Sequence, residues 1–362
     1  MTTNCKKILL VAGARPNFMK IAPLLRVIDQ SYFDRLRPII VHTGQHYDYE
    51  MSQAFFEDLQ IKRPDYFLGV GPGSHAVQTA MIMTAFEEVC LREIPDLVVV
   101  VGDVNSTLAC ALVAKKMGIR VAHVEAGLRS RDLTMPEEIN RMVTDVLADY
   151  LFVSERSGLA NLWQEGRPPE AIHFVGNVMV DTLYLQLASL EETHANRPEP
   201  YAVLTLHRPA NVDVASKLLE IMDAVAVIAR DLPVEFPAHP RTRQRLEALD
   251  LTAGLTGRGI NLLPPLPYKT FLRLWKDAAL VLTDSGGLQE ETTALGVPCI
   301  TIRDNTERPV TVAEGTNILA GTDYQGIITA YETFKSTGGK KGRVPELWDG
   351  QAAARIVAIL AK

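Results

Sequence analysis

The five residues Leu97–Val101 read Leu-Val-Val-Val-Val, an unbroken apolar run that is followed by Gly102-Asp103. Such a run is typical of a parallel strand that is covered on both faces, because neither face needs polar side chains. Similar short runs alternate along the chain with segments of helical periodicity. One example is the strand expected at 7–12, which is followed by apolar residues at helical spacing over 21–28. Alternating strands and helices predict parallel sheets with right-handed crossovers.

The alternation occurs twice, which predicts two Rossmann-like, doubly wound parallel-sheet domains. The first domain is expected at residues 1–176 and the second at 177–348, followed by a short amphipathic helix within 349–362. Strands of the first domain are expected at 7–12, 38–42, 97–101, 120–124, 150–153 and 173–175. Strands of the second domain are expected at 201–206, 234–236, 261–263, 280–283 and 299–302.

Length and composition exclude several classes of protein. A chain of 362 residues, 47% hydrophobic and 22% charged, is typical of a globular protein with two cores. The formal net charge of −6 and the scattered basic residues argue against nucleic-acid binding. No apolar run approaches a membrane span, and the N-terminus has no signal-peptide pattern. The four cysteines lack metal or redox spacing, so we expect free thiols in a cytoplasmic protein.

The turn Ser285-Gly286-Gly287 follows an apolar strand and directly precedes a helix. Free backbone N–H groups and the positive end of the helix dipole then favour a phosphate at this point. Glu290 and Glu291 follow one turn into the helix, where a carboxylate suits the hydroxyls of a ribose. The sequence therefore predicts nucleotide binding; the structural alternative is a βα turn that needs glycine for its geometry.

Ligands of open α/β sheets bind beyond the carboxyl ends of the strands, which selects a small set of polar residues. In the second domain the set is His207, His239 and Ser285. In the first it is Arg15, Asp103 and Glu125. Helix capping is the structural alternative for Asp103, whereas a carboxylate at the end of an apolar strand, as at Glu125, is costly unless it is used.

Two carboxylates at successive strand ends suit acid–base chemistry, because crowding and burial separate their pKa values. The histidines lack the spacing of metal ligands, so we favour acid–base chemistry over a metal site. The first βα turn, which holds Arg15 and is followed by Lys20, lacks the Gly-x-Gly-x-x-Gly pattern of dinucleotide-binding proteins. We therefore expect no redox cofactor.

In this order, the motifs resemble those of the non-hydrolysing UDP-N-acetylglucosamine 2-epimerases. In the first half they are Gly-Ala-Arg-Pro-x-Phe-Met-Lys from 13, Thr-Gly-Gln-His-Tyr-Asp from 43, Gly-Asp-Val-Asn-Ser-Thr from 102, His-Val-Glu-Ala-Gly-Leu-Arg from 123 and Pro-Glu-Glu-Ile-Asn-Arg from 136. Later come Val-Gly-Asn from 175, His-Arg-Pro-Ala-Asn from 207, Asp-Ser-Gly-Gly-Leu-Gln-Glu-Glu from 284 and Arg-Asp-Asn-Thr-Glu-Arg-Pro from 303.

This resemblance implies a fold like that of the two-domain (GT-B) glycosyltransferases, with a central cleft, a last helix that returns to the first domain, and a homodimer. It implies inversion of C2 of a UDP-2-acetamido sugar by elimination and re-addition of UDP, without a cofactor. The implied catalytic residues are Asp103, Glu125, Glu137 and His207. The implied substrate-binding residues are Arg15, Lys20, His239, Ser285, Gly286, Gly287 and Glu291.

The sequence leaves alternatives open. A glycosyltransferase of the same architecture, a hydrolysing 2-epimerase and an inactive nucleotide-sugar sensor all share the nucleotide site, although the carboxylate cluster favours an epimerase. Many bacterial relatives have a basic residue after the Gln-His of a regulatory substrate site, whereas Tyr47-Asp48 follows Gln45-His46 here. The same variant is found in relatives acting on UDP-2,3-diacetamido-uronic acids, so the sugar and the regulation stay open.

Overall fold

The computed structural model describes residues 5–44, 56–57, 59–190 and 199–362. Gln45 and His46 lie outside the described residues. The chain divides into two compact units, of which the first comprises Met1–Leu185 with Glu346–Lys362 and the second Gln186–Pro345. The boundary expected from the sequence lies earlier, after Gly176. Thr182 Oγ1 donates a hydrogen bond to the carbonyl of Met19, which ties the start of α7 (Val178–Ala188) to the first unit.

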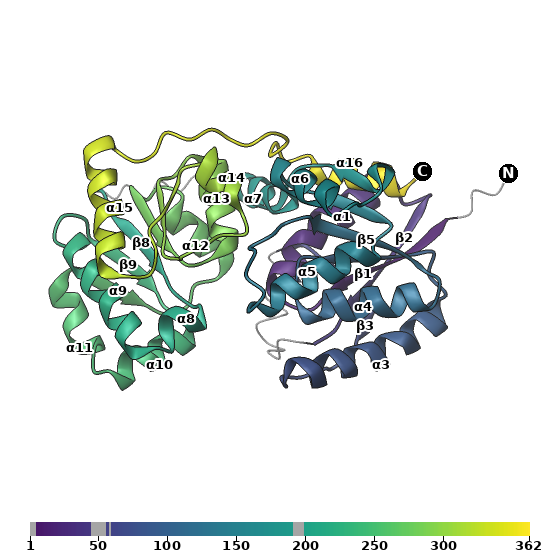
Figure 1. Ribbon diagram of the computed structural model, residues 1–362, viewed down its shortest axis with the longest axis horizontal. Coiled ribbons are helices and arrows are strands. Elements are labelled where there is room, and N and C mark those ends of the chain that lie inside the picture. The colour runs from purple at the N-terminus through teal and green to yellow at the C-terminus, as the bar shows by residue number, and fades with distance from the viewer. Residues whose placement is uncertain (1–4, 45–55, 58, 191–198) are drawn as a thin grey trace. The chain divides into compact units, whose positions relative to one another are not determined.

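Within its described residues, the first unit contains a seven-stranded parallel sheet in the order β3-β2-β1-β4-β5-β6-β7 (Figure 1). Its strands are β1 Lys6–Ala12, β2 Leu36–His42, β3 Tyr66–Phe67, β4 Leu97–Val101, β5 Arg120–Ala126, β6 Tyr150–Val153 and β7 Ile172–Phe174. The helices are α1 Arg15–Ser31, α3 His75–Glu93, α4 Asn105–Lys116, α5 Pro136–Leu147, α6 Arg156–Gln164, α7 and α16 Ala352–Leu360.

The sheet of the first unit is buried on both faces, as the apolar run of β4 predicted. Leu9 and Val11 of β1 pack in one core with Ile82 and Phe86 of α3. The alternate residues of β1 are equally buried, and α1 packs on β1. Burial on both faces explains why these strands carry no polar alternation.

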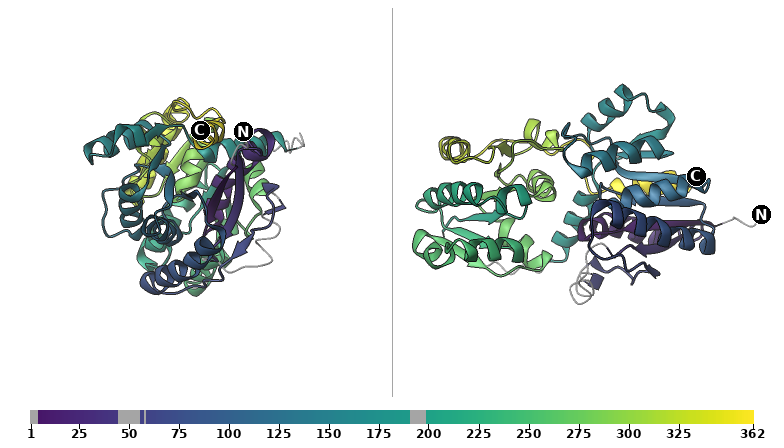
Figure 2. Two further views of the ribbon diagram at one scale, coloured as in Figure 1. Left: turned by 90° about the vertical axis from the view of Figure 1, so that its right-hand side faces the viewer. Right: turned by 60° about the horizontal axis from the view of Figure 1, so that its bottom comes forward.

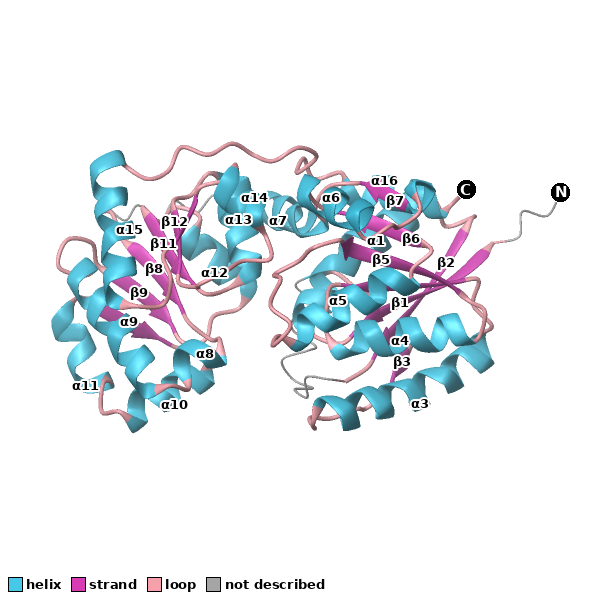
Figure 3. Ribbon diagram, in the orientation of Figure 1, coloured by secondary structure: helices cyan, strands magenta, loops and turns pink. Residues whose placement is uncertain are grey.

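The second unit contains a six-stranded sheet in the order β10-β9-β8-β11-β12-β13, again with parallel pairing (Figure 3). Its strands are β8 Ala202–Thr205, β9 Val234–Pro237, β10 Ile260–Leu263, β11 Leu280–Thr283, β12 Cys299–Thr301 and β13 Asn317–Leu319. Its helices are α8 Pro209–Val212, α9 Ala215–Ile228, α10 Pro240–Ala248, α11 Thr252–Leu255, α12 Tyr268–Trp275, α13 Gly286–Leu295, α14 Pro309–Ala313 and α15 Tyr324–Thr337. The predicted fold class of two doubly wound parallel sheets is confirmed.

Two short edge strands, β3 and β13, escape the sequence pattern. They are two and three residues long, and each pairs with a single neighbour. A strand of two or three residues is too short to give a recognisable apolar run. The stronger signals agree with the structure: β4, β6 and β11 have the expected bounds, and Ser74 caps α3 by accepting a hydrogen bond from Val77 N.

The C-terminal helix α16 packs on α1 in the first unit (Figures 1 and 2). Asp181 of α7 accepts hydrogen bonds from the amides of Ala352 and Ala353, at distances of 3.1 and 2.7 Å. These amides belong to the first turn of α16 and have no partner within the helix. A buried carboxylate of α7 therefore anchors the start of the last helix.

Candidate active site

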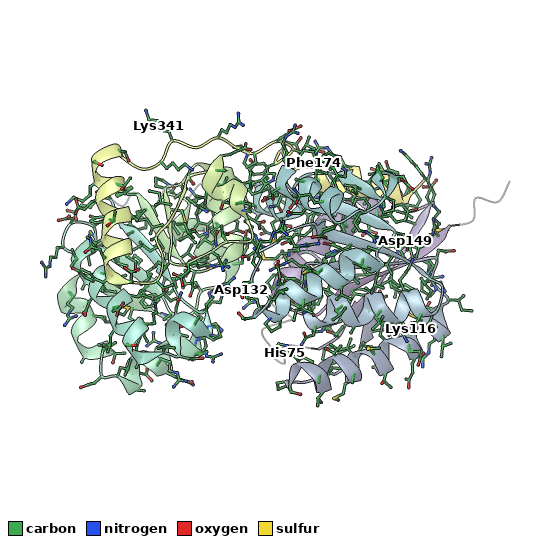
Figure 4. The ribbon with its side chains drawn as sticks, in the orientation of Figure 1. His75, Lys116, Asp132, Asp149, Phe174 and Lys341 are labelled. Atoms are coloured by element: carbon green, nitrogen blue, oxygen red, sulfur yellow. The ribbon has the colours of Figure 1, made fainter. Side chains whose placement is uncertain are left out.

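The carboxyl ends of β1, β4 and β5 are neighbours in the first sheet, whose strand order reverses between β1 and β4. This is the ligand-binding edge of a doubly wound sheet. It brings together Asp103 after β4 and Glu125 in β5, as the sequence predicted. In Figure 4, Asp132 and His75 lie towards this edge of the first unit, whereas Lys116 and Asp149 lie at the opposite edge.

Glu125 occupies a strained position at the end of β5. The register of β5 with β6 shifts between Val124 and Ala126, so Glu125 is the bulged residue, and its φ angle is +76°. A left-handed backbone is costly for a residue with a side chain and clusters at functional sites. The Glu125 side chain is 7% exposed and forms an ion pair with Lys20, which is equally buried. The expected burial of a carboxylate here is accompanied by a cation that balances its charge.

Gly102 gives the Lys20 ammonium room. It precedes Asp103, has a φ angle of +68°, and a Cβ atom added here would lie 2.9 Å from Lys20 Nζ. The positive φ angle favours glycine, because other residues avoid this backbone conformation. The short distance favours glycine because a side chain would push against the Lys20 ammonium. Lys20, expected as a substrate-binding residue, thus pairs with Glu125 and lies close to the backbone immediately before Asp103.

Asp103 does not cap the following helix. The N-cap of α4 is Val104, and no side chain caps this helix. Instead, Asp103 Oδ2 accepts a hydrogen bond of 3.0 Å from Arg141 Nε, and the Asp103 carbonyl accepts one of 2.9 Å from Asn140. The Asp103 side chain is 25% exposed. The capping alternative is wrong, because the carboxylate is oriented by α5 and its remaining surface is open.

The paired glutamates at the start of α5 have different surroundings. Glu138 is 1% exposed, accepts hydrogen bonds from the amides of Ser130 and Arg131, and pairs with Arg141. Glu137 is partly exposed, and within the described residues its side chain makes no hydrogen bond or ion pair. Glu138 therefore holds the preceding loop, whereas Glu137 has a carboxylate available for a ligand. The spacing of Glu138 and Arg141, three residues apart on a helix, is the sequence signal for the structural pair.

In the second unit, His207 follows β8, and its partner is Asp284, whose role the sequence pattern does not indicate. His207 Nδ1 lies 2.9 Å from Oδ1 of Asp284, which follows β11 and is fully buried. Asp284 also accepts hydrogen bonds from the amides of His207 and Arg208. Burial acts to raise the pKa of Asp284, but its hydrogen bonds and the charge of His207 outweigh burial and lower it. The His207 side chain is 47% exposed, so the aspartate orients a ring whose other nitrogen can reach a ligand.

The turn after β11 places a helix N-terminus beside a buried arginine. Ser285 is the N-cap of α13, and Gly286 is its first residue. Neither Gly286 nor Gly287 has a positive φ angle, so turn geometry does not require glycine here. A Cβ atom on Gly286 would instead lie 2.6 Å from Nη1 of Arg308. Glycine is needed because a guanidinium approaches the backbone, and this arrangement of a cation beside a helix N-terminus suits a phosphate.

Arg308 belongs to a buried charge network that includes Glu290, Arg303 and Glu307. Arg308 pairs with Glu307 and lies 2.8 Å from Glu290 Oε1, and Arg303 lies 2.7 Å from Glu307 Oε2. Burial opposes ionisation of Glu307, but the charges of Arg308 and Arg303 hold its pKa well below its usual range. The sequence pattern alone assigns these residues no individual role, although Arg303, Glu307 and Arg308 belong to the motif that begins at residue 303.

Glu291 lies in the second turn of α13 and is 5% exposed. Its carboxylate accepts a hydrogen bond of 2.5 Å from the Tyr268 hydroxyl. Burial raises the pKa of Glu291 to about 7, against the effect of the Tyr268 hydrogen bond. Glu290 faces Arg308 instead, so the two adjacent glutamates have different partners, and the ribose-binding role of Glu291 stays a prediction.

The remaining candidates lie at the predicted edges. Arg15 is exposed in the first turn of α1, directly after β1. His239 is exposed after β9, and its Nδ1 atom accepts a hydrogen bond of 3.3 Å from the Arg241 amide at the start of α10. His239 is therefore the N-cap of α10, and its Nδ1 atom is the acceptor in this hydrogen bond.

Among the described residues no group of three His, Cys, Asp or Glu side chains is placed to hold a metal ion, and no described helix is long and apolar enough to cross a membrane.

Comparison with known proteins gives the family. Residues 31–361 match the family model described as UDP-N-acetylglucosamine 2-epimerase. The UDP-N-acetylglucosamine 2-epimerase of Methanocaldococcus jannaschii is 42% identical over 365 residues, with 98% of each chain covered. The UDP-2,3-diacetamido-2,3-dideoxy-D-glucuronate 2-epimerase of Pseudomonas aeruginosa is 40% identical over 361 residues, covering 98% of this chain and 99% of the relative.

The crystal structure of the Methanocaldococcus jannaschii enzyme in complex with UDP-GlcNAc and UDP has a TM-score of 0.89, covering 98% of this chain and 99% of that chain. Two parallel sheets with polar residues at their carboxyl ends define a two-domain, Rossmann-like enzyme. The chain belongs to the UDP-N-acetylglucosamine 2-epimerase family, whose members are isomerases. The predicted family and enzyme class are thereby confirmed.

Proposed function

We propose that the protein inverts C2 of UDP-N-acetylglucosamine, giving UDP-N-acetylmannosamine without net hydrolysis. The family of the chain supports this proposal. The observation that carries it is the set of acidic side chains at the carboxyl edge of the first sheet. Asp103, Glu125 and Glu137 have three different environments there, which suits a reaction that removes a proton on one face of a carbon and returns it on the other.

The proton on C2 has no adjacent carbonyl, so its removal must be coupled to loss of a leaving group. We propose that UDP leaves C1 with the electron pair of the C1–O bond while a carboxylate takes the C2 proton. The product pair is UDP and a 2-acetamidoglucal with a C1–C2 double bond. Protonation of C2 from the opposite face and attack of the UDP oxygen on C1 then give the epimer.

The site residues divide between proton handling and binding. We propose that Asp103, Glu125, Glu137 and His207 handle protons and charge. The substrate-binding residues are Arg15, Lys20, His239, Ser285, Gly286, Gly287 and Glu291, with the diphosphate at the N-terminus of α13 and the ribose at Glu291. The amides of α13 and the Arg308 guanidinium support the diphosphate assignment, because both stabilise the charge that UDP gains as it leaves.

A second candidate substrate is UDP-2,3-diacetamido-2,3-dideoxy-D-glucuronate. The Pseudomonas aeruginosa relative that is named for this sugar is 40% identical over nearly the whole chain, almost as similar as the relative named for UDP-N-acetylglucosamine. Both sugars carry the same C2 acetamido group and the same UDP leaving group, so the proposed chemistry is unchanged.

Incubation with each UDP-sugar in D₂O, followed by NMR, tests the proposal. A 2-epimer with deuterium at C2 is the expected product. Free sugar and UDP would identify a hydrolysing epimerase instead. If neither sugar reacts without an acceptor, the proposed epimerisation of these sugars is wrong, and turnover on addition of acceptors would identify a glycosyltransferase.

We also propose a homodimer, as the family resemblance implies. The α5 side chains Ile139, Met142, Val143 and Val146 are 37–61% exposed. Their spacing places them on one face of the helix, which is the pattern of a helix that packs against another protein surface. Sedimentation of wild type and Val146→Asp tests this face.

A cytoplasmic location is proposed from the four unpaired cysteines, three of which are buried.

A further inference from the structure

A histidine in the apolar strand β5 bonds to the loop that carries Asp103. His123 is 0% exposed, and its Nε2 atom lies 2.8 Å from the carbonyl oxygen of Gly102. Its Nδ1 atom lies 2.7 Å from Oδ1 of Asp145 on α5. A carbonyl and a carboxylate are both hydrogen-bond acceptors, so the His123 ring is held at both of its nitrogens.

Asp145 connects the His123 ring to the residues that follow β5, Gly127 and Arg129. Its second oxygen accepts a hydrogen bond of 3.1 Å from the Gly127 amide and lies 2.7 Å from Arg129 Nη1. Arg129 in turn forms two hydrogen bonds with Glu165. Burial acts to raise the pKa of Asp145, but the hydrogen bonds and charges of His123 and Arg129 lower it. Asp145 is therefore a fully buried carboxylate that keeps its charge.

The backbone groups held by this network lie next to both candidate acid–base residues. Gly102 directly precedes Asp103, and the Gly102 amide donates to the carbonyl of Val124. Glu125 lies between Val124 and Gly127, in the bulge where φ is +76°. His123 and Asp145 thus fix the backbone on both sides of Glu125 and immediately before Asp103.

Stability alone is a poor explanation for such a network. Replacing buried ion pairs with apolar residues is often neutral or stabilising, because desolvating the charges is costly. The neighbouring strand residues Val121, Ala122 and Val124 are apolar and buried, so a histidine is an exception on β5. An apolar side chain at 123 would fill the core but could not hold the Gly102 carbonyl.

We propose that His123 and Asp145 are positioning residues, which fix the Asp103 and Glu125 carboxylates relative to each other for reaction at C2. This inference rests on the proposed function. The pair does not itself reach the substrate, because both side chains are fully buried. Loss of the pair should lower turnover and leave UDP affinity unchanged, because the proposed diphosphate and ribose contacts, the start of α13 and Glu291, lie in the second unit.

Asp145→Asn is the principal variant, because it keeps the shape of the side chain and removes the charge. Asp149→Asn is its matched control. Asp149 also accepts a hydrogen bond from a β5 amide, that of Val121, and also pairs with a cation, Lys115, but at the opposite edge of the sheet (Figure 4). We expect Asp145→Asn to lower kcat by about 10–100-fold, the range known for loss of the residues that orient metal ligands in other enzymes. KM and UDP affinity should stay within about twofold, and the control should keep kcat at a temperature where both variants are folded.

Backbone NMR makes the test independent of activity. The amide resonances of Asp103 and Glu125 should shift in Asp145→Asn and stay in place in Asp149→Asn. His123→Gln is the second variant, because its amide N–H group can still donate to Gly102; it should retain more turnover than His123→Leu, which cannot donate.

The possible outcomes are distinct. A wild-type protein that exchanges no C2 proton with either UDP-sugar would overturn the proposed function, and the amide shifts would then decide the positioning. Unmoved amides at 103 and 125 in Asp145→Asn would overturn the inference even in an active enzyme. Equal losses of kcat in the two asparagine variants, or a parallel loss of UDP affinity, would reduce the network to a structural role.

Discussion

Nδ1 of His207 lies 2.9 Å from Oδ1 of Asp284, and the two residues follow neighbouring strands, β8 and β11. The carboxylate is fully buried, while the ring is half exposed. Asp284 also receives the amides of His207 and Arg208, so it fixes both the ring and the backbone that carries it. This arrangement sets one tautomer of His207 and leaves Nε2 for a ligand.

Asp284→Asn should therefore lower kcat. Asp284 accepts from the His207 ring and from the amides of His207 and Arg208. An asparagine has only one acceptor oxygen, so its N–H₂ group would face one of these donors and the His207 ring would lose its fixed orientation. We expect a loss of about 10–100-fold in kcat, measured from C2 deuterium incorporation. Asp213→Asn is the control, because Asp213 also pairs with cationic side chains of the second unit but lies among arginines of α10. Unchanged turnover in Asp284→Asn would contradict a role for the pair.

The two adjacent glutamates of α5 should separate activity from stability. Glu137→Gln should lower kcat by about 10²–10⁴-fold, the usual range for general acid–base groups, with little change in unfolding. Glu138→Gln should destabilise the fold by roughly 3 kcal/mol, because it removes the buried anion of Arg141 and leaves only the partly exposed Asp103 as its partner. Chemical denaturation and initial rates on both variants check this. The reverse result, with Glu138 critical only for rate, would show that the site is misassigned.

Gly286→Ala should weaken nucleotide binding. The added methyl would displace Arg308 Nη1, which would otherwise be 2.6 Å away, and would disturb its pairing with Glu307. We expect UDP affinity to fall about tenfold, equivalent to 1.4 kcal/mol. Gly254→Ala provides the control, because a methyl at Gly254 meets open space. Calorimetric titration with UDP measures both, and equal affinities would place the diphosphate elsewhere.

Glu291 should make stability depend on pH. Its ordinary pKa of 4.5 is raised to about 7 in the folded protein, chiefly by burial. The native state then binds this proton more tightly than the unfolded state, so the contribution of Glu291 to stability falls as pH rises from about 4.5 through 7. Glu291→Gln removes this loss and should be more stable than wild type by on the order of 2 kcal/mol at pH 8.

At pH 4 the Glu291→Gln variant and wild type should unfold with equal free energies, because the carboxyl is protonated in both states. Denaturant titrations at the two pH values provide the measurement, with Glu247→Gln, an exposed position on α10, as the reference. The same variant should bind UDP-sugars more weakly at pH 8, if the carboxylate holds the ribose. A pH-independent difference in stability would show that Glu291 titrates normally.

The sequence by itself determined the fold class, because a strand covered on both faces has to be apolar along its length, as β4 is. It also determined where to look for the site, since the carboxyl-edge rule depends only on strand order along the chain. Asp103, Glu125, His207 and Ser285 all follow from that rule, and the structure places each at the expected edge. These features are local, so one sequence suffices to find them.

Only the tertiary structure decided which partner each of these groups has. Lys20 pairs with Glu125, Arg141 with Asp103, Asp284 with His207, and Arg308 lies beside Gly286. It also separated Glu137 from Glu138 and revealed the His123–Asp145 pair. Each of these contacts depends on how deeply the two side chains are buried and on where they point. The periodicity and spacing of residues in the sequence carry no information about either. The physical reason is that the charge state and orientation of a buried group are set by the atoms packed around it, most of which come from elsewhere in the chain.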